Sequence, residues 1–123
     1  MTLEYRKFII RKHLHDEPEK LFAFGDNIAR KGLGGQAAAC RGEPNAVGIP
    51  TKWKPSMTPD SFFSDADLEF WLKESYQDRI RLLDFKGIIV WPSNGIGTGL
   101  ACLPIKAPRI YAEIKQLERI LNG

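Results

Sequence analysis

Residues 21–51 read LFAFGDNIARKGLGGQAAACRGEPNAVGIPT, a stretch that combines an apolar segment, a glycine-rich loop and a run of alanines. A short apolar run, Leu21–Phe24, stops at Gly25–Asn27, and a loop with two cations and three glycines follows. The chain then enters Gln-Ala-Ala-Ala at residues 36–39, which favours the start of a helix. A strand, a polar turn, a glycine loop and a helix in this order can point several backbone N–H groups at one bound anion. We predict a binding site here; the alternative is a glycine-rich connector without a ligand.

Another glycine-rich loop follows the clearest strand of the chain, Ile88–Trp91. It reads PSNGIGTGL over residues 92–100. Ligands of open α/β sheets lie outside the carboxyl ends of the strands. If Leu21–Phe24 and Ile88–Trp91 are parallel neighbours, the two loops face each other across one crevice. This convergence is the strongest functional inference from the residues.

Strands alternate with helices through most of the chain, which predicts an α/β fold. A chain of 123 residues suits one domain with one core, so we expect a single domain over residues 1–123. Its sheet is expected to be mixed and flanked by helices in a Rossmann-like arrangement. The expected strands are residues 5–14, 21–24, 45–49 and 88–91, and the expected helices are residues 36–41, 64–83 and a last one that begins near Pro108.

Two of these helices carry apolar stripes, which we interpret as core-facing. Ser64, with Asp67 three residues later, is a variant of the capping box and starts the first of them. Residues 53–61 contain two prolines and lack periodicity, which predicts an irregular loop that could cover the site. The stripes are Leu68, Trp71, Leu72, Tyr76, Ile80 and Leu83, and then Ile110, Ile114, Leu117 and Leu121.

The composition is that of an ordinary globular protein, with 43% hydrophobic and 27% charged residues. No apolar run approaches the roughly 20 residues that span a bilayer, and the N-terminal residues do not form a signal peptide. A cytoplasmic protein without a membrane partner is therefore expected. The net charge of +3 favours anionic partners only mildly, because the cations are spread along the chain.

The cysteines and histidines do not form a recognisable metal site. Cys40 and Cys102 lack the spacing of a zinc motif, and we interpret both as small packing residues, with a reactive thiol as the alternative. His13 and His15 would share one side of an extended segment, but no further histidine completes a metal site. We predict no metal and no cofactor.

The two loops offer many backbone donors and few nucleophiles. Asn94 and Thr98, together with the glycines around them, suit a phosphate or diphosphate and a sugar hydroxyl. Asp26 could accept a bond from an adenine amino group or a ribose hydroxyl; the alternative is that it only caps its turn. The predicted ligand-binding residues are Gly25, Asn27, Arg30, Gly34, Gly35, Gln36, Thr51, Asn94, Gly95, Ile96, Gly97, Thr98, Gly99 and Leu100.

Catalysis would depend on few side chains. The chain has no Ser-His-Asp order, GxSxG, Walker lysine loop or HExxH. Asp26 and Lys52 are the candidate acid/base residues, and loop N–H groups could stabilise developing charge. Arg30 and Arg41 could pair with a phosphate, or be solvated cations without that role. Hydrolysis of a phosphate ester, or of an N-glycosidic or ester bond to ribose, would suit these groups.

Two motifs resemble known families. Gly25–Ile28 resembles the Gly-Asp-Ile that opens macrodomains, and Ser93–Ala101 resembles their diphosphate-binding loop. This resemblance covers only the two loops, and it implies ADP-ribose-type ligands, a mixed sheet between helices and no obligatory metal. The whole chain is also similar to small phage and bacterial proteins that carry "FGDN…GxGGQA…R…GIPTK" and "GxGTGL", a group without an assigned activity. In a phage protein, sequestration could remove a nucleotide signal of host defence.

These observations predict a protein that binds a nucleotide or an ADP-ribose-like ligand between its glycine loops and either hydrolyses or sequesters it. The alternative is an accessory module that binds nucleic acid or protein and whose glycine loops are structural. Trp53, with Lys52 and Lys54 on either side, could then stack on bases in a flexible segment.

Overall fold

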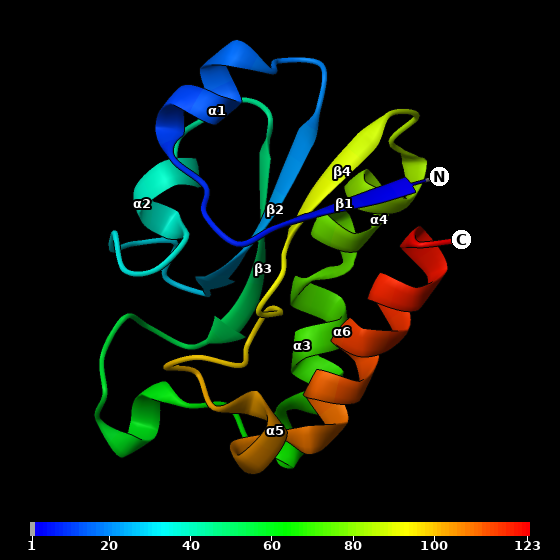
Figure 1. Cartoon of the computed structure of the whole chain (residues 1–123). Helices are drawn as coiled ribbons and strands as arrows, with labels where there is room; N and C mark the ends of the chain where they lie inside the picture. The colour runs from blue at the N-terminus through cyan, green and yellow to red at the C-terminus, as the bar shows by residue number, and fades with distance from the viewer. Residues whose placement is uncertain (1) are drawn as a thin grey trace.

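A parallel sheet of four strands forms the middle of the molecule (Figure 1). The computed structural model describes residues 2–123, and in them every strand pair is parallel, in the order β1-β4-β2-β3. The α/β class is therefore confirmed, although the sheet has no antiparallel strand where a mixed sheet was expected. The strands are β1 (Thr2–Arg6), β2 (Leu21–Asn27), β3 (Ala46–Lys52) and β4 (Ile88–Pro92).

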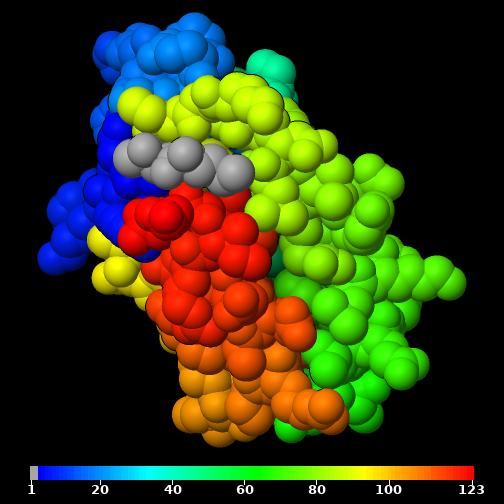
Figure 2. All heavy atoms as spheres, turned by 90° about the vertical axis from the view of Figure 1, so that its right-hand side faces the viewer, coloured from blue at the N-terminus to red at the C-terminus, as the bar shows by residue number. Residues whose placement is uncertain are grey.

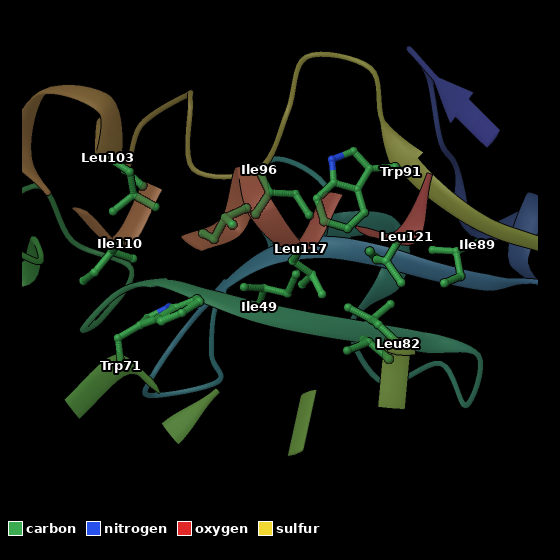
Figure 3. Packing of buried hydrophobic residues seen from close by; sticks show 14 of the residues in the cluster. Ile49, Trp71, Leu82, Ile89, Trp91, Ile96, Leu103, Ile110, Leu117 and Leu121 are labelled. Carbon is green, nitrogen blue, oxygen red and sulfur yellow. The ribbon is translucent and has the colours of Figure 1, made fainter. Parts of the chain in front are cut away.

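Helices cover both faces of this sheet (Figure 1). On one face, α3, α4 and α6 surround a large apolar cluster that includes Ile49, Ile89 and Trp91, and Figure 3 shows its side chains gathered together. On the other face, α1 and α2 pack with Phe22, Phe24 and Val90. Burial on both faces explains why the strands are almost continuously apolar. The helices are α1 (Arg11–Asp16), α2 (Ala37–Cys40), α3 (Leu68–Glu74), α4 (Tyr76–Asp84), α5 (Leu103–Lys106) and α6 (Pro108–Leu121).

The first predicted strand was too long. β1 ends at Arg6, and Arg11–Asp16 form helix α1 instead of an extended segment. The helix needs only one inward side chain, Leu14, which is fully covered, while its charged side chains face outward. The His13 ring accepts a bond from the backbone N–H of Ile10 at 3.2 Å and so serves the start of the helix. The mixture of charged and apolar residues that indicated a strand with one wet face is also compatible with this short helix.

Strands β2 and β3 extend further than predicted, through Asp26-Asn27 and through Thr51-Lys52. Their pairing continues to Asn27 and Lys52, with an irregularity after Asp26. β3 is an edge strand, which is where a proline such as Pro50 can be accommodated. The polar residues that were expected to follow the strands are therefore positioned by the strands themselves.

The long predicted helix is divided into α3 and α4 at Ser75. The predicted capping box is present, since the backbone N–H of Ser64 donates to the Asp67 carboxylate at 2.9 Å, but it starts a short 3-10 helix, η2 (Asp65–Asp67), which leads into α3. The Ser75 hydroxyl donates to the carbonyl of Trp71 at 2.7 Å, a bond that competes with regular helix geometry. The division changes the buried stripe, so that Leu82 is fully buried while Tyr76 is exposed.

The last helix agrees with its prediction. α6 begins at Pro108, and its four predicted apolar residues are buried. In Figure 2 it lies beside α3 and α4 on one face of the molecule, as their contacts require. Within residues 2–123, no helix has the length and apolar character that crossing a membrane needs.

Candidate functional site

A pocket of about 600 Å³ opens at the carboxyl ends of β2, β3 and β4. β4 pairs with β2 only at Leu21 and Phe22, whereas β3 stays paired with β2 as far as Asn27. The pairing of β2 with β4 therefore ends at Phe22, and the pocket lies between the ends of these two strands. Its walls are the first glycine loop (residues 31–36), the second glycine loop (residues 94–101) and the segment 55–57.

The pocket contains almost every residue that the sequence singled out. Both candidate catalytic residues line it, and so do all the predicted ligand-binding residues except Arg30. Arg41, which was also weighed as a phosphate partner, lines it too. The roles of these residues in binding and catalysis remain predictions, since no ligand is present. The lining residues that were not predicted are Lys31, Gly32, Leu33, Ala37, Pro55, Ser56, Met57, Pro92 and Ala101.

Most of these additional residues are neighbours of predicted ones, so their positions in the glycine loops could have identified them. Pro55, Ser56 and Met57 belong to the irregular segment that was expected to cover the site, and they form one wall of the pocket. Gly48 does not line the pocket, but it packs against Asp26, and the sequence did not indicate that this position needs glycine. A Cβ at this position would lie 2.5 Å from the Asp26 carboxylate, so the need for glycine arises from packing between two strands.

The backbone of both glycine loops has unused donors. Among residues 2–123, the N–H groups of residues 32–36 and 96–101 find no hydrogen-bond acceptor. Gly32, Gly35, Gly95 and Gly97 have φ between 55° and 91°, a left-handed conformation in which successive N–H groups can form an anion-binding nest. The two loops thus present a pocket wall of free donors with little side-chain cover.

Asp26, near the end of β2, is the carboxylate that pairs with two arginines beside the first glycine loop. Its side chain is only 4% exposed, and it forms an ion pair with Arg41 at 2.5 Å. Asp26 Oδ1 also accepts the backbone N–H of Asn27 at 2.8 Å, and Oδ2 is 3.3 Å from the Arg30 guanidinium. Both carboxylate oxygens are therefore already engaged, which favours a bracing role. The acid/base role of Asp26 remains a prediction.

Arg41 links this carboxylate to the glycine loop. Its guanidinium donates to the carbonyl of Gly32 at 2.7 Å and to that of Lys31 at 3.0 Å, as well as to Asp26. The Asn27 amide adds a further bond of 2.8 Å to the carbonyl of Lys31. The conformation of the first glycine loop thus depends on side chains that reach it from β2 and from the end of α2.

Arg30 lies behind the pocket wall. It donates to the carbonyl of Gly48 at 2.9 Å and pairs with Asp78 of α4 at 2.8 Å. Burial raises the pKa of the Asp78 carboxyl, and the bond to Arg30 opposes that shift. Arg30 therefore joins the loop to the helical layer. Arg30 was expected to line the pocket, but it does not, and its contacts connect parts of the fold.

The second glycine loop is held by packing and by its own backbone. Ile96 is buried in the large apolar cluster, and the carbonyl of Gly97 accepts the N–H of Leu103 at 2.9 Å. A Cβ at Gly97 would overlap the side chain of Leu103. The Thr98 hydroxyl donates to the carbonyl of Asn94 at 2.6 Å. Among residues 2–123, no ion pair includes a residue of this loop.

Lys52 and Thr51 line the pocket from the end of β3. The Thr51 hydroxyl donates to the carbonyl of Asp26 at 2.9 Å, which connects β3 to β2. The Lys52 ammonium donates to the carbonyl of Ser56 and lies 3.5 Å from the sulfur of Met57. Burial lowers the pKa of Lys52, and the nearby Cys102 thiol partly opposes this shift. Lys52 thereby fixes the segment that forms the third wall.

Gln36 contributes a buried acceptor. Its Oε1 has no hydrogen-bond partner among residues 2–123, although it is covered by protein and the residue lines the pocket. Buried polar atoms normally have a partner. A ligand that carries a hydroxyl or amino donor would supply one, which agrees with the amide contact predicted for Gln36.

The two cysteines differ in their surroundings. Cys40 is fully buried, and burial raises the pKa of its thiol to about 11, so it is a packing residue as interpreted. Cys102 is half-buried and has φ of 50° at the start of α5. His15 bonds to Glu43 at 3.0 Å, away from the pocket. Among residues 2–123, no three metal-binding side chains gather at one point.

The residues that motivated the nucleic-acid alternative are engaged in other contacts. The ring of Trp53 packs against Phe63 at 5.2 Å and against Phe70 at 4.6 Å. Lys52 is buried, and Lys54 pairs with Asp60 at 3.2 Å. This segment therefore does not present a free aromatic face between two free cations.

The chain belongs to a family of unknown function (DUF7831), which it matches over residues 4–117. No curated protein and no solved structure matches it. The match is consistent with the expected membership of a group without an assigned activity. The resemblance of the two loops to macrodomains remains a prediction.

Proposed function

We propose that this protein binds a nucleotide or an ADP-ribose-like ligand through its phosphates, between the two glycine loops, and hydrolyses or sequesters it. One observation carries the proposal. Two loops more than 50 residues apart in the chain line one pocket, and both contain backbone N–H groups that have no acceptor among residues 2–123. Most of these residues are exposed, so their N–H groups are free to bond to a ligand, and phosphate oxygens are suitable acceptors.

The rim of the pocket supports a ligand with an apolar ring as well as phosphates. Leu33, Met57 and Leu100 line the pocket and are 67%, 58% and 70% exposed. Single exposed apolar side chains are common, but these three come from three different segments and meet at one opening. A nucleobase has two apolar faces that such side chains could cover. The unpartnered Gln36 oxygen would accept a bond from a ribose hydroxyl or an amino group.

Sequestration requires only the features described above, whereas hydrolysis requires a general acid or base. Asp26 is held by two arginines, and Lys52 is held by the carbonyl of Ser56. If hydrolysis occurs, one of these two groups must exchange a present contact for one with the substrate. Turnover is therefore to be measured separately from binding.

A thermal-shift screen tests the proposal. The probes are ADP-ribose, NAD, cyclic ADP-ribose isomers and cyclic dinucleotides, with short oligonucleotides as the comparison. A ligand of the native state raises Tm by mass action, by an amount that grows with its concentration. We expect at least one of the nucleotides to do so, and chromatography of the incubated nucleotide then shows whether it is cleaved.

The matched variant is Gly99→Val. Gly99 lines the pocket, and a Cβ there meets no atom within 4 Å, so the fold should tolerate the side chain while the second glycine loop loses space for a ligand. We expect the variant to keep the Tm of the free protein and to lose the nucleotide shift. Stabilisation by oligonucleotides alone, or by no probe, would contradict the proposal.

A further inference from the structure

One cation in the pocket wall is buried without an anion. Lys52 ends β3 and is only 8% exposed. Its ammonium has three neutral neighbours: the carbonyl of Ser56, the sulfur of Met57 and the ring of Phe62, whose centre is 4.5 Å away. The ion pairs of residues 2–123 do not include Lys52.

The two arginines beside the pocket are paired with carboxylates, whereas Lys31, which also lines the pocket, is exposed to solvent and has no ion pair among residues 2–123. Arg41 bonds to Asp26, and Arg30 bonds to Asp26 and Asp78. Lys52 therefore differs from these two arginines, because its partners are neutral groups and theirs are carboxylates. A buried charge that is not paired destabilises a folded protein, because a carbonyl dipole and an aromatic face replace its hydration only partly.

The surroundings of Lys52 add no anion from other elements. The Cys102 thiol is the titratable group that affects the charge of Lys52, and the ammonium of Lys106 lies 4.5 Å from the centre of the same Phe62 ring. Burial lowers the pKa of Lys52, as expected for an ammonium that lacks a counter-charge. Lys52 thus shares the Phe62 ring with a second ammonium group, that of Lys106, and also lines the pocket.

We propose that Lys52 is the counter-charge for the anionic group of the pocket's ligand, and that the chain keeps this cation unpaired to leave it free for that group. The inference rests on the proposed function, and it deepens that function by naming the charged contact. A ligand phosphate would give Lys52 an anionic partner, as carboxylates already do for Arg41 and Arg30. The neutral contacts with Ser56 and Met57 hold the ammonium in place until then.

The test compares Lys52→Met with Lys54→Met. Methionine keeps the length and apolar stem of lysine and removes the charge. Lys54 is two residues away, is exposed, and does not line the pocket, so it controls for the loss of one positive charge. Calorimetric titrations use pyrophosphate, which is an anion without a base or sugar, and ADP-ribose. The Tm of each free variant is measured as well.

We expect Lys52→Met to weaken pyrophosphate binding about 10- to 100-fold, the range for loss of a hydrogen bond to a charged group, and Lys54→Met to change it less than about twofold. The free Lys52→Met protein should melt at the same or a higher temperature than the natural chain, because it no longer buries an unpaired charge. A Tm well below that of Lys54→Met would assign Lys52 a structural role and overturn the inference.

The remaining outcomes separate this inference from the proposed function. If ADP-ribose binds equally well to Lys52→Met and to the natural chain, the nucleotide function stands and the role of Lys52 is overturned. If pyrophosphate binding depends on Lys52 but no nucleotide binds, the anion site stands and the nucleotide function fails. If neither pyrophosphate nor any nucleotide of the thermal-shift screen binds the natural chain, both are overturned.

Discussion

The two glycine loops form opposite walls of one pocket, but they are held by different forces. The first glycine loop is tied down by ion pairs and side-chain bonds, chiefly from Arg41 to Asp26 and to the carbonyls of Lys31 and Gly32. The second is tied down by contact with the core, through Ile96 and through Gly97 against Leu103. The comparison shows that similar glycine-rich sequences can be positioned by charge in one case and by steric fit in the other.

This difference has consequences for how each loop responds to change. Ion pairs that are partly exposed weaken as salt concentration rises, whereas packing contacts do not. Glycines at open positions tolerate a side chain, whereas a glycine against the core does not. Variants of Gly97, Asp26 and Arg41 test this difference between the two loops, and a variant of Glu17 measures an ion pair outside the pocket.

The largest effect is expected for Gly97→Ala. Its φ of 86° disfavours any side chain, and the added Cβ would overlap Leu103. Strain of about 1–2 kcal/mol and overpacking of about 1–3 kcal/mol predict a loss of about 2–5 kcal/mol in the free energy of unfolding. Urea denaturation measures this loss in the free energy of unfolding. Gly99→Ala is the control and should change stability by less than about 0.5 kcal/mol; equal losses in the two variants would refute the steric account.

Asp26→Asn should have the next largest effect. The amide removes the charge that two arginines share, although Arg30 and Arg41 retain 40% and 20% exposure and can be partly hydrated. We expect a loss of about 2–3 kcal/mol in the free energy of unfolding, below the full cost of breaking a buried pair. Thermal and urea unfolding should agree. A loss below about 0.5 kcal/mol would show that the ion pairs do not hold the first glycine loop.

Arg41→Met should cost about 1–2 kcal/mol, because it removes one ion pair and two bonds to loop carbonyls. The difference from the natural chain should shrink between low salt and about 0.5 M salt, since the guanidinium is half-buried and partly screened. The Gly97→Ala difference should not change with salt. Urea unfolding at both salt concentrations makes the comparison. A salt-independent Arg41→Met difference would contradict the electrostatic account.

The smallest effect is expected outside the pocket. Bonds from Arg6 and Lys20 lower the pKa of Glu17 to about 2. Because the folded pKa lies below the ordinary value of 4.5, this contribution is present above pH 4.5 and is lost as pH falls toward 2. Glu17→Gln should therefore cost about 1 kcal/mol or less at pH 7 and nothing near pH 2, because the pairs are partly exposed. Unfolding measured across this pH range tests it, and ligand binding should be unchanged.

Several elements could be predicted from local sequence. Leu21–Phe24 and Ile88–Trp91 are strands because their apolar residues are buried on both faces of a parallel sheet. The Ser64 cap depends on a partner only three residues away. By contrast, residues 11–16 were expected to be extended, and the division at Ser75 was not foreseen. In short segments the local preferences for strand and helix are close in energy, and packing decides between them.

The candidate site was also predictable in part. Glycine positions and polar residues at strand ends identified most of the pocket lining. The place of Arg30 behind the wall, and the need for glycine at position 48, could not be inferred, because both depend on contacts between residues distant in the chain. The residue types alone also made Asp26 and Lys52 look alike as acid/base candidates, although one is paired and the other is not.

Residue types along the chain are enough to indicate which segments are apolar enough to be strands and where glycine allows the chain to turn beside the pocket. These properties depend on residue type and on neighbours within a few positions. Only the tertiary structure decided that β2 and β4 separate beyond Phe22, that Asp26 receives two arginines, and that Lys52 receives no carboxylate. Burial and charge pairing arise between residues far apart in the chain, so their energies are set when the strands and helices pack together.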